Sequence, residues 1–194
     1  MRIKERFIRR SKENMSSLGS EAMKKAIETG EIFYKGKKPP KIGGNSIDLR
    51  LGKYVWRIKR GFDIELKEPM HYDICSEELY GFALYPDEGY LMHSEEFIGS
   101  TVKNLNAVFH TRSTLARNFI SFHQSAGFGD PGFKSRWVFE VTTLVPVFIA
   151  IGTPVGQLSF HRVEDNEILY TGKYNVGPDE WTPEHMLPKQ TFFV

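Results

Sequence analysis

Cysteine is nearly absent from this sequence, because Cys75 is the only one in 194 residues. One cysteine cannot form an intramolecular disulfide and supplies too few thiolates for a metal cluster, so we expect a reducing, cytoplasmic setting. Long apolar runs are also absent, since no stretch approaches the roughly 20 apolar residues of a membrane helix. The first residues, MRIKERFIRRSK, lack the apolar centre of a secretion signal. We therefore expect a soluble protein with no membrane partner.

A large excess of one charge is missing as well. The chain has 26 Lys and Arg against 24 Asp and Glu, which gives a formal net charge of +2. Proteins that track nucleic acid along their surface usually carry a marked basic excess, so no nucleic-acid partner is expected. Any phosphate group should instead meet a local cluster of basic side chains.

Helical periodicity is scarce, and only SEAMKKAIETG (20–30) predicts a helix. Ser20 suits its N-cap, and Gly30 can end it. Its apolar face would consist of Ala22, Met23, Ala26 and Ile27. Elsewhere, turn residues separate short runs such as SIDLRL, YVWRI, RWVFEVT, VPVFIAI and QLSFHRV. Many short strands between turns predict a mainly β fold, a sandwich or barrel, with one helix packed on it.

The composition also suggests three regions. Residues 1–15 form a basic extension, either an arm for an acidic partner or a frayed tail. Residues 16–174 carry the strand pattern and predict one compact domain. Residues 175–194 begin with NVGPDEWTPEHMLPKQ, which is polar and aperiodic, and predict an extended tail that frays or lies across a neighbouring subunit.

The segment RSTLAR (112–117) is the first candidate for a chemical site. Arg112, Ser113, Thr114 and Arg117 combine two guanidinium groups, two hydroxyls and nearby backbone amides. These groups suit the oxygen-rich surface of a di- or triphosphate. The same spacing also fits a turn leading into a short helix with exposed arginines.

The segment AGFGDPGF (126–133) is the second candidate. Glycines around Asp130 allow a ligand to approach the backbone, while Phe128 and Phe133 offer apolar faces for a sugar or base. The carboxylate of Asp130 would suit a ribose hydroxyl. An ordinary β-turn before Pro131 is the alternative.

Glu140 is the third candidate, because it stands in the apolar strand pattern RWVFEVT. Alternation places Trp137 and Phe139 on one face and Val138 and Glu140 on the other. Partial burial should raise the pKa of Glu140 and poise it for proton transfer near neutral pH, unless an arginine offsets the shift. Alternatively, Glu140 faces solvent on a half-exposed strand.

Taken together and in this order, these segments resemble the dCTP deaminase family, part of the trimeric dUTPase-like superfamily. The resemblance covers IETGEI, PPKIGGNSIDLRLG, RSTLAR, AGFGDPGF, VFEV, IGTPVGQLSF and GKY. It implies a distorted β jelly roll or barrel of the dUTPase-like type with a short N-terminal helix. It also implies a homotrimer with an active site at each subunit interface.

The resemblance further implies a role for each matched residue. Glu140 would shuttle protons while a water, held by Ser113 and the Ala126 carbonyl, attacks carbon 4 of cytosine; Arg117 would hold the carboxylate and the water. Asp130 would contact the deoxyribose and assist a second hydrolysis where one occurs. The implied nucleotide-binding set is Arg112, Ser113, Thr114, Arg117, Asp130, Phe133, Gln157, Tyr170, Lys173 and Tyr174.

The expected chemistry needs no metal held by the protein. Magnesium would arrive on the triphosphate. Zinc deaminases pair an H-x-E element with a downstream P-C-x-x-C, but here only His93-Ser94-Glu95 is present and the lone cysteine lies upstream. We therefore expect zinc-independent deamination of a deoxycytidine nucleotide, with the histidines in structural or surface roles.

Several activities stay open from the sequence. The main expectation is dCTP to dUTP plus ammonia. The first alternative is a bifunctional enzyme that forms dUMP and pyrophosphate, which Gly127 after Ala126 favours. A plain dUTPase and a non-catalytic nucleotide-binding trimer follow, and the strand glutamate Glu140 and the pair Ser113 and Arg117 argue against them.

Overall fold

Residues 16–58, 72–75, 80–124 and 126–188 are described by the computed structural model of the chain. The predicted extension (1–15) and residues 189–194 of the predicted tail lie outside the described residues, and the predicted region boundaries stay a prediction. In chain order the elements are α2 (Ser20–Glu28), β1 (Ile32–Lys35), β2 (Ile47–Ile58), β3 (Tyr72–Cys75), β4 (Gly81–Leu84), β5 (Tyr90–Ser100), β6 (Leu105–Thr111), α3 (Ser113–Ala116), β7 (Ile120–Phe122), β8 (Phe128–Gly129), β9 (Lys134–Thr143), β10 (Val147–Ala150), β11 (Pro154–Arg162) and the 3-10 helix η1 (Pro183–Met186).

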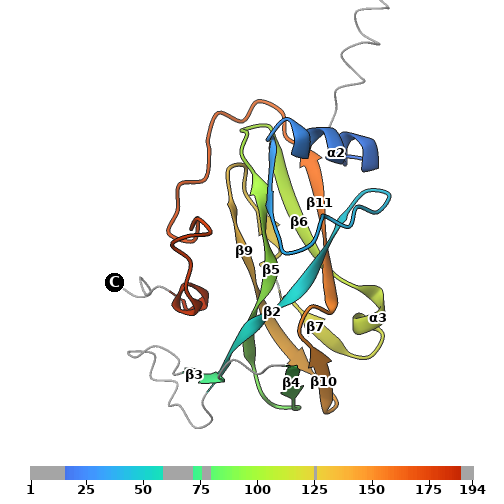
Figure 1. Cartoon of the computed structure of the whole chain (residues 1–194), viewed down its shortest axis with the longest axis vertical. Helices are drawn as coiled ribbons and strands as arrows, with labels where there is room; N and C mark the ends of the chain where they lie inside the picture. Colours follow the sequence, from blue (N-terminus) through green and yellow to red (C-terminus); the bar gives the residue numbers. More distant parts are fainter. Residues whose placement is uncertain (1–15, 59–71, 76–79, 125, 189–194) are drawn as a thin grey trace, which may run out of the picture.

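Nine strands form one antiparallel sheet that curls around the core as a half-barrel (Figure 1). Its order is β7-β9-β5-β2-β11-β6-β8, with β1 also paired to β5 and β3 to β2. Strands β4 and β10 pair separately at one end of the molecule (Figure 1). Strand β2 pairs with β11, more than a hundred residues later in the chain, through partners such as Asp48 and Gln157. The mainly β prediction with a short N-terminal helix is confirmed.

The core lies inside the curl of the sheet. Phe122 of β7, Phe139 of β9 and Phe160 of β11 are fully buried there. Helix α2 covers one end and buries Met23 and Ala26 against the same cluster. Aromatic side chains of this size each remove a large apolar area from water, so the strands that carry them are held firmly in place. Within the described ranges, no helix is long and apolar enough to cross a membrane.

Two local predictions need correction. Ser20 does not cap α2, since Gly19 is the N-cap and makes no side-chain cap bond, and Ala22 points to solvent. The runs SIDLRL and YVWRI are not separate strands but parts of the twelve-residue β2. The glycine between them does not end the strand, because a register shift against β5 between Leu51 and Val55 absorbs the irregularity.

Candidate active site

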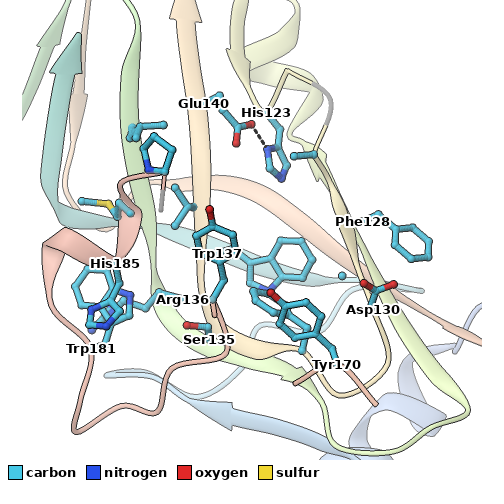
Figure 2. A pocket seen from close by; sticks show the side chains of 18 residues that line it. His123, Phe128, Asp130, Ser135, Arg136, Trp137, Glu140, Tyr170, Trp181 and His185 are labelled. Carbon is cyan, nitrogen blue, oxygen red and sulfur yellow. Dashed lines mark hydrogen bonds and ion pairs between the residues drawn. The ribbon is translucent and has the colours of Figure 1, made fainter. Parts of the chain in front are cut away.

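A cavity of about 440 Å³ opens beside β9. Strand β7 pairs with β9 only at Val141–Thr143, so the edge of β9 before Glu140 has no partner in β7. Most of the lining comes from β9 itself, the loop before it that includes β8, and the segment after β11 (Figure 2), and Leu91 of β5 completes it. Glu140 therefore lies where β9 and the loop before it meet the distant segment after β11.

Glu140 projects from the face of β9 that the alternation predicts. Trp137 and Phe139 are buried in the core, and Trp137 also borders the cavity; Val138 and Glu140 lie on the opposite face of β9 and line the cavity as well. The Glu140 side chain keeps 37% of its surface exposed. It is thus neither a solvated surface group nor a buried one, and it can be reached from the cavity.

The direct partner of Glu140 is His123. Its Nδ1 lies 2.6 Å from Glu140 Oε2 (Figure 2), and the backbone N–H of Gln124 donates to the same oxygen at 3.4 Å. Burial alone would raise the pKa of Glu140, but the hydrogen bond and charge of His123 outweigh it and lower that pKa below its usual value. The predicted rise is therefore wrong in direction, and the residue that offsets burial is a histidine rather than an arginine.

His123 has a second notable atom. Its side chain is only 8% exposed, and its Nε2 is buried without a hydrogen-bond partner among the described residues. Phe109 and Phe139 pack edge-on against the ring and fix its orientation. A buried imidazole held this firmly can set the direction of the Glu140 carboxylate.

Asp130 sits on a tight turn at the opposite wall of the cavity. The Phe133 N–H donates to the Asp130 carbonyl at 2.9 Å, and Gly132 has φ of +93°. Pro131 followed by a glycine with positive φ is the pattern of a type II turn. The turn suggested as the alternative is thus present, and it directs the Asp130 carboxylate toward the same cavity that Glu140 lines (Figure 2).

The glycines of this loop have packing roles. A Cβ on Gly129 would lie 2.6 Å from the ring of Trp137, and one on Gly132 would crowd Leu169 and Tyr170 in addition to its positive φ. The protein's own aromatic and backbone atoms therefore occupy the space that these glycines leave. We expected these glycines to let a ligand approach the backbone, but in the structure they make room for the protein's own side chains and backbone.

The segment after β11 forms the third wall. Tyr170 donates its N–H to the Pro131 carbonyl at 2.7 Å and packs edge-on against Phe133. Further on, Val176 is buried and accepts a hydrogen bond from Ser135 Oγ through its carbonyl. Over 175–188 the predicted tail thus packs on its own sheet, neither frayed nor extended away from it.

Trp181 and Met186 secure the end of this segment. The Trp181 ring lies 4.9 Å from the guanidinium carbon of Arg136 and 4.7 Å from the His93 ring centroid. Trp56 Nε1 donates to the Pro183 carbonyl at 2.9 Å, and Met186 is 4% exposed. These contacts hold Trp181 and His185 where they line the cavity.

The RSTLAR residues lie in a different place. Arg112 precedes α3 and donates to Asp48 Oδ2 at 2.5 Å, and Gln157 donates to Asp48 Oδ1 at 3.3 Å. Ser113, Thr114 and Arg117 are exposed on or beside α3. None of the five lines the cavity. The turn into a short helix with exposed residues, given above as the alternative, is what the structure contains.

The predicted set therefore divides into two groups. The cavity group consists of Ala126, Asp130, Phe133, Glu140, Tyr170 and Tyr174. The α3 group consists of Arg112, Ser113, Thr114, Arg117 and Gln157. Lys173 belongs to neither group and lies 5.3 Å from the centre of the Tyr174 ring. Among the residues that the structure describes, no three His, Cys, Asp or Glu side chains gather as a metal site.

Sequence reasoning missed His123, Trp181 and His185 as cavity residues. His123 was expected to be structural or at the surface, yet the register of β7 with β9 places it opposite Glu140. In that register Ile120 faces Thr143 and Phe122 faces Val141, so the next residue, His123, faces Glu140. The pairing of β7 with β9, two strands separated by β8 in the chain, is what brings His123 to Glu140. Trp181 and His185 lie in a segment without periodicity, and no pattern in the sequence predicts that they line the cavity.

Comparisons with known proteins place the chain in a family. A family model described as dCTP deaminase-like matches residues 17–163. A protein of Methanosphaerula palustris named dCTP deaminase, dUMP-forming, is 32% identical over 152 residues, covering 76% of this chain and 81% of that protein. A protein of the same name from Methanopyrus kandleri is 30% identical over 187 residues, covering 89% and 96%.

A solved structure shares the fold. The 2'-deoxycytidine 5'-triphosphate deaminase from Agrobacterium tumefaciens superposes with a TM-score of 0.59 at 17% identity, covering 77% of this chain. The match spans 49% of that longer chain, so the chain corresponds to about half of its length. The predicted distorted jelly roll or barrel of the dUTPase-like type is confirmed.

Proposed function

The chain belongs to the dCTP deaminase-like family, and from this premise we propose that it hydrolyses dCTP to dUMP in two steps. In the first, water adds to carbon 4 of cytosine and ammonia leaves, which gives dUTP. In the second, water splits dUTP between its α- and β-phosphates, which gives dUMP and pyrophosphate. The observation that carries the proposal is the Glu140 carboxylate, held by His123 and facing the cavity beside β9.

Glu140 supplies the proton transfers of deamination. As a carboxylate it takes a proton from the attacking water, and as a carboxylic acid it gives that proton to the departing amino group. His123 fixes the direction of the carboxylate through the 2.6 Å contact and keeps it ionised by lowering its pKa. The carbonyl of Ala126, on the cavity wall, holds the water on its other side.

The remaining groups come from a second subunit. Ser113 and Arg117, which would hold the water and the carboxylate, lie on α3 and directly after it, outside the cavity of their own chain. A homotrimer in which α3 of one chain reaches the cavity of the next brings both groups together, and it forms three sites. The division of the predicted residues into two groups supports this assembly.

The nucleotide then spans the two groups. Asp130 and Phe133 receive the deoxyribose, Tyr170 and Tyr174 cover the base, and Lys173 extends the same wall. From the neighbouring chain, Arg112, Thr114 and Gln157 face the phosphates. Asp48 holds Arg112 and Gln157 together, so a rigid cluster rather than loose side chains meets the triphosphate.

Magnesium enters as part of the substrate, bound to the triphosphate of dCTP. Deamination itself proceeds without zinc, because Glu140 and His123 already provide a carboxylate that activates water. The proposed partners are thus the nucleotide and further copies of the chain.

Formation of dUMP rests on the relatives and on Asp130. Both curated relatives compared above carry the name dUMP-forming, which favours the bifunctional alternative over release of dUTP. Asp130 faces the cavity and is the carboxylate available to assist the second water.

Incubation of the purified protein with dCTP and magnesium should yield dUMP, pyrophosphate and ammonia in equal amounts. Ion-exchange chromatography separates the nucleotides, and a coupled assay measures pyrophosphate. Accumulation of dUTP as the end product would retain deamination and exclude the second step. Turnover of dUTP without turnover of dCTP would identify a plain dUTPase, and binding of both nucleotides without turnover would identify a non-catalytic trimer.

His123→Gln should move the acid limb of the kcat/KM profile for dCTP to higher pH. The substitution keeps a hydrogen-bond donor but removes the imidazole charge, one of the His123 interactions that lower the pKa of Glu140, so burial is offset less and that pKa rises. The carboxylate is protonated at a higher pH, and activity is lost earlier on acidification. The profile is measured from pH 4 to pH 9. His161→Gln, on β11 outside the cavity, should leave the limb unchanged; an unmoved limb in the His123 variant contradicts the positioning role.

A further inference from the structure

The side chain of Asn175 joins the turn that carries Asp130 to the segment after β11. Its Oδ1 accepts a hydrogen bond at 3.1 Å from the N–H of Lys134, the first residue of β9. Its Nδ2 donates to the carbonyls of Gly132 at 3.2 Å and Tyr170 at 3.3 Å. One amide group therefore binds the turn after Asp130, the start of β9 and the third wall of the cavity.

The three partners use both ends of this amide and fix its orientation. An asparagine amide has two N–H donors and a carbonyl acceptor. The Lys134 N–H can only donate, and the carbonyls of Gly132 and Tyr170 can only accept, so each end of the amide has one possible place. Neither an aspartate nor an aliphatic side chain could satisfy these three backbone groups together.

Asn175 is itself held by the backbone around it. Its N–H donates to the Gly172 carbonyl at 3.1 Å, which closes a turn that contains the cavity residue Tyr174. The next residue, Val176, is buried and accepts the hydrogen bond from Ser135 Oγ at 3.3 Å. The Asn175 side chain therefore projects from a fixed position.

The direction of the Asp130 carboxylate depends on this arrangement. Asp130 is exposed at the cavity, so the backbone of its turn, rather than packing around the side chain, sets where the carboxylate points. The Tyr170 N–H donates to the Pro131 carbonyl at 2.7 Å, and Asn175 donates to the next carbonyl, that of Gly132. Hydrogen bonds from a distant segment thus hold two consecutive carbonyls of the turn.

We propose that Asn175 is a positioning residue of the nucleotide site, which holds the Asp130 carboxylate where it meets the sugar hydroxyl of the nucleotide. The proposal rests on the proposed function, in which Asp130 receives the deoxyribose. Asn175 does not line the cavity, so it acts through the turn. Because dCTP has one free sugar hydroxyl, at carbon 3', this hydroxyl is the group whose binding Asn175 controls.

The contribution of that hydroxyl to binding tests the proposal. Isothermal titration calorimetry with magnesium compares dCTP with 2',3'-dideoxyCTP, which lacks the hydroxyl. Every protein compared carries Glu140→Gln, so that deamination does not consume dCTP. With Asn175 intact, dCTP should bind roughly 10-fold to 100-fold more tightly than the dideoxy analogue, the effect of one hydrogen bond to a charged group.

Asn175→Asp should reduce this preference to less than about threefold. The substitution keeps the shape of the side chain, but a carboxylate oxygen then faces the carbonyls of Gly132 and Tyr170, which it repels. Asn175→Ala, which removes the three hydrogen bonds without adding a charge, should lower the preference as well. A general loss of structure, checked by thermal denaturation, would weaken both ligands equally and leave their ratio unchanged.

Asn166→Asp is the matched control. Asn166, in the same segment after β11, donates to the carbonyls of Lys103 at 2.6 Å and Ile168 at 2.8 Å and accepts from the Ile168 N–H, outside the cavity. The control variant should keep the full preference for dCTP.

Three results overturn the proposal: an unchanged preference in both Asn175 variants, an equal loss in the Asn166 variant, or equal binding of the two nucleotides while Asn175 is intact. The first of these, with dCTP turnover present in the wild type, leaves the proposed function standing. A preference that depends on Asn175, in a chain whose wild type is inactive on dCTP, would sustain the proposal while rejecting the proposed function.

Discussion

Glu140→Gln should reduce dCTP turnover by roughly 10²–10⁴-fold, the contribution typical of a positioned general acid–base group. Glutamine has nearly the shape of glutamate and can still bond to His123, but it neither accepts a proton from water nor delivers one to the amino group. The substitution therefore removes the chemistry and preserves the cavity wall. Single-turnover measurements with dCTP give the rate of deamination directly.

Binding separates this effect from a structural one. Because Val138 and Trp137 keep β9 in place, the Glu140→Gln protein should bind dCTP with an affinity near that of the wild type, measured by isothermal titration calorimetry. Glu164→Gln, at an exposed glutamate after β11, is the matched control and should turn over normally. Near-normal turnover in the Glu140 variant would refute the role given to that carboxylate.

Mixing two inactive proteins should restore activity. Glu140→Gln inactivates the cavity of a chain, and Arg117→Ala inactivates its α3. In a trimer where each site combines the cavity of one chain with α3 of the next, every mixed assembly contains one junction where an intact cavity meets an intact α3. Random mixing of equal amounts makes about three quarters of the trimers mixed, each with one working site in three, so about one quarter of the wild-type activity should return.

Each variant refolded by itself is the control for the mixture. Subunits are exchanged by joint refolding or by expression with two affinity tags, and deamination of dCTP is measured on the doubly purified fraction and on the mixture. Each variant refolded alone should stay inactive. A mixture no more active than its parts would mean that Glu140 and Arg117 serve the same site from one chain, contrary to the shared arrangement.

Much of the fold follows from local chemistry in the sequence. The alternation in RWVFEVT places Glu140 opposite Trp137 and Phe139, and it does so correctly because the two faces of a strand differ in burial. The turn at Asp130 is equally local, since Pro131 and Gly132 dictate its shape. These features depend on neighbours in the chain, which a sequence displays directly.

The rest depends on contacts between distant segments. His123 meets Glu140 only because β7 and β9 pair in one register, and a shift of one residue would turn the ring away. The pKa of Glu140 follows from that contact, so burial alone predicted its direction wrongly. Trp181 reaches the cavity through packing on Arg136 and His93, which no local periodicity encodes.

The pairing of β2 with β11 also determines when the sheet can close during synthesis of the chain. Asp48 and Gln157, partners across these strands, stand 109 residues apart in the chain. At a translation rate of roughly 5–20 residues per second, β2 leaves the ribosome about 5–20 seconds before its partner exists. The half-barrel therefore cannot close during most of its own production, and its central strand waits with one edge unpaired. Lower growth temperatures, and chaperones that cover unpaired strand edges of the nascent chain, should accordingly raise the yield of folded protein.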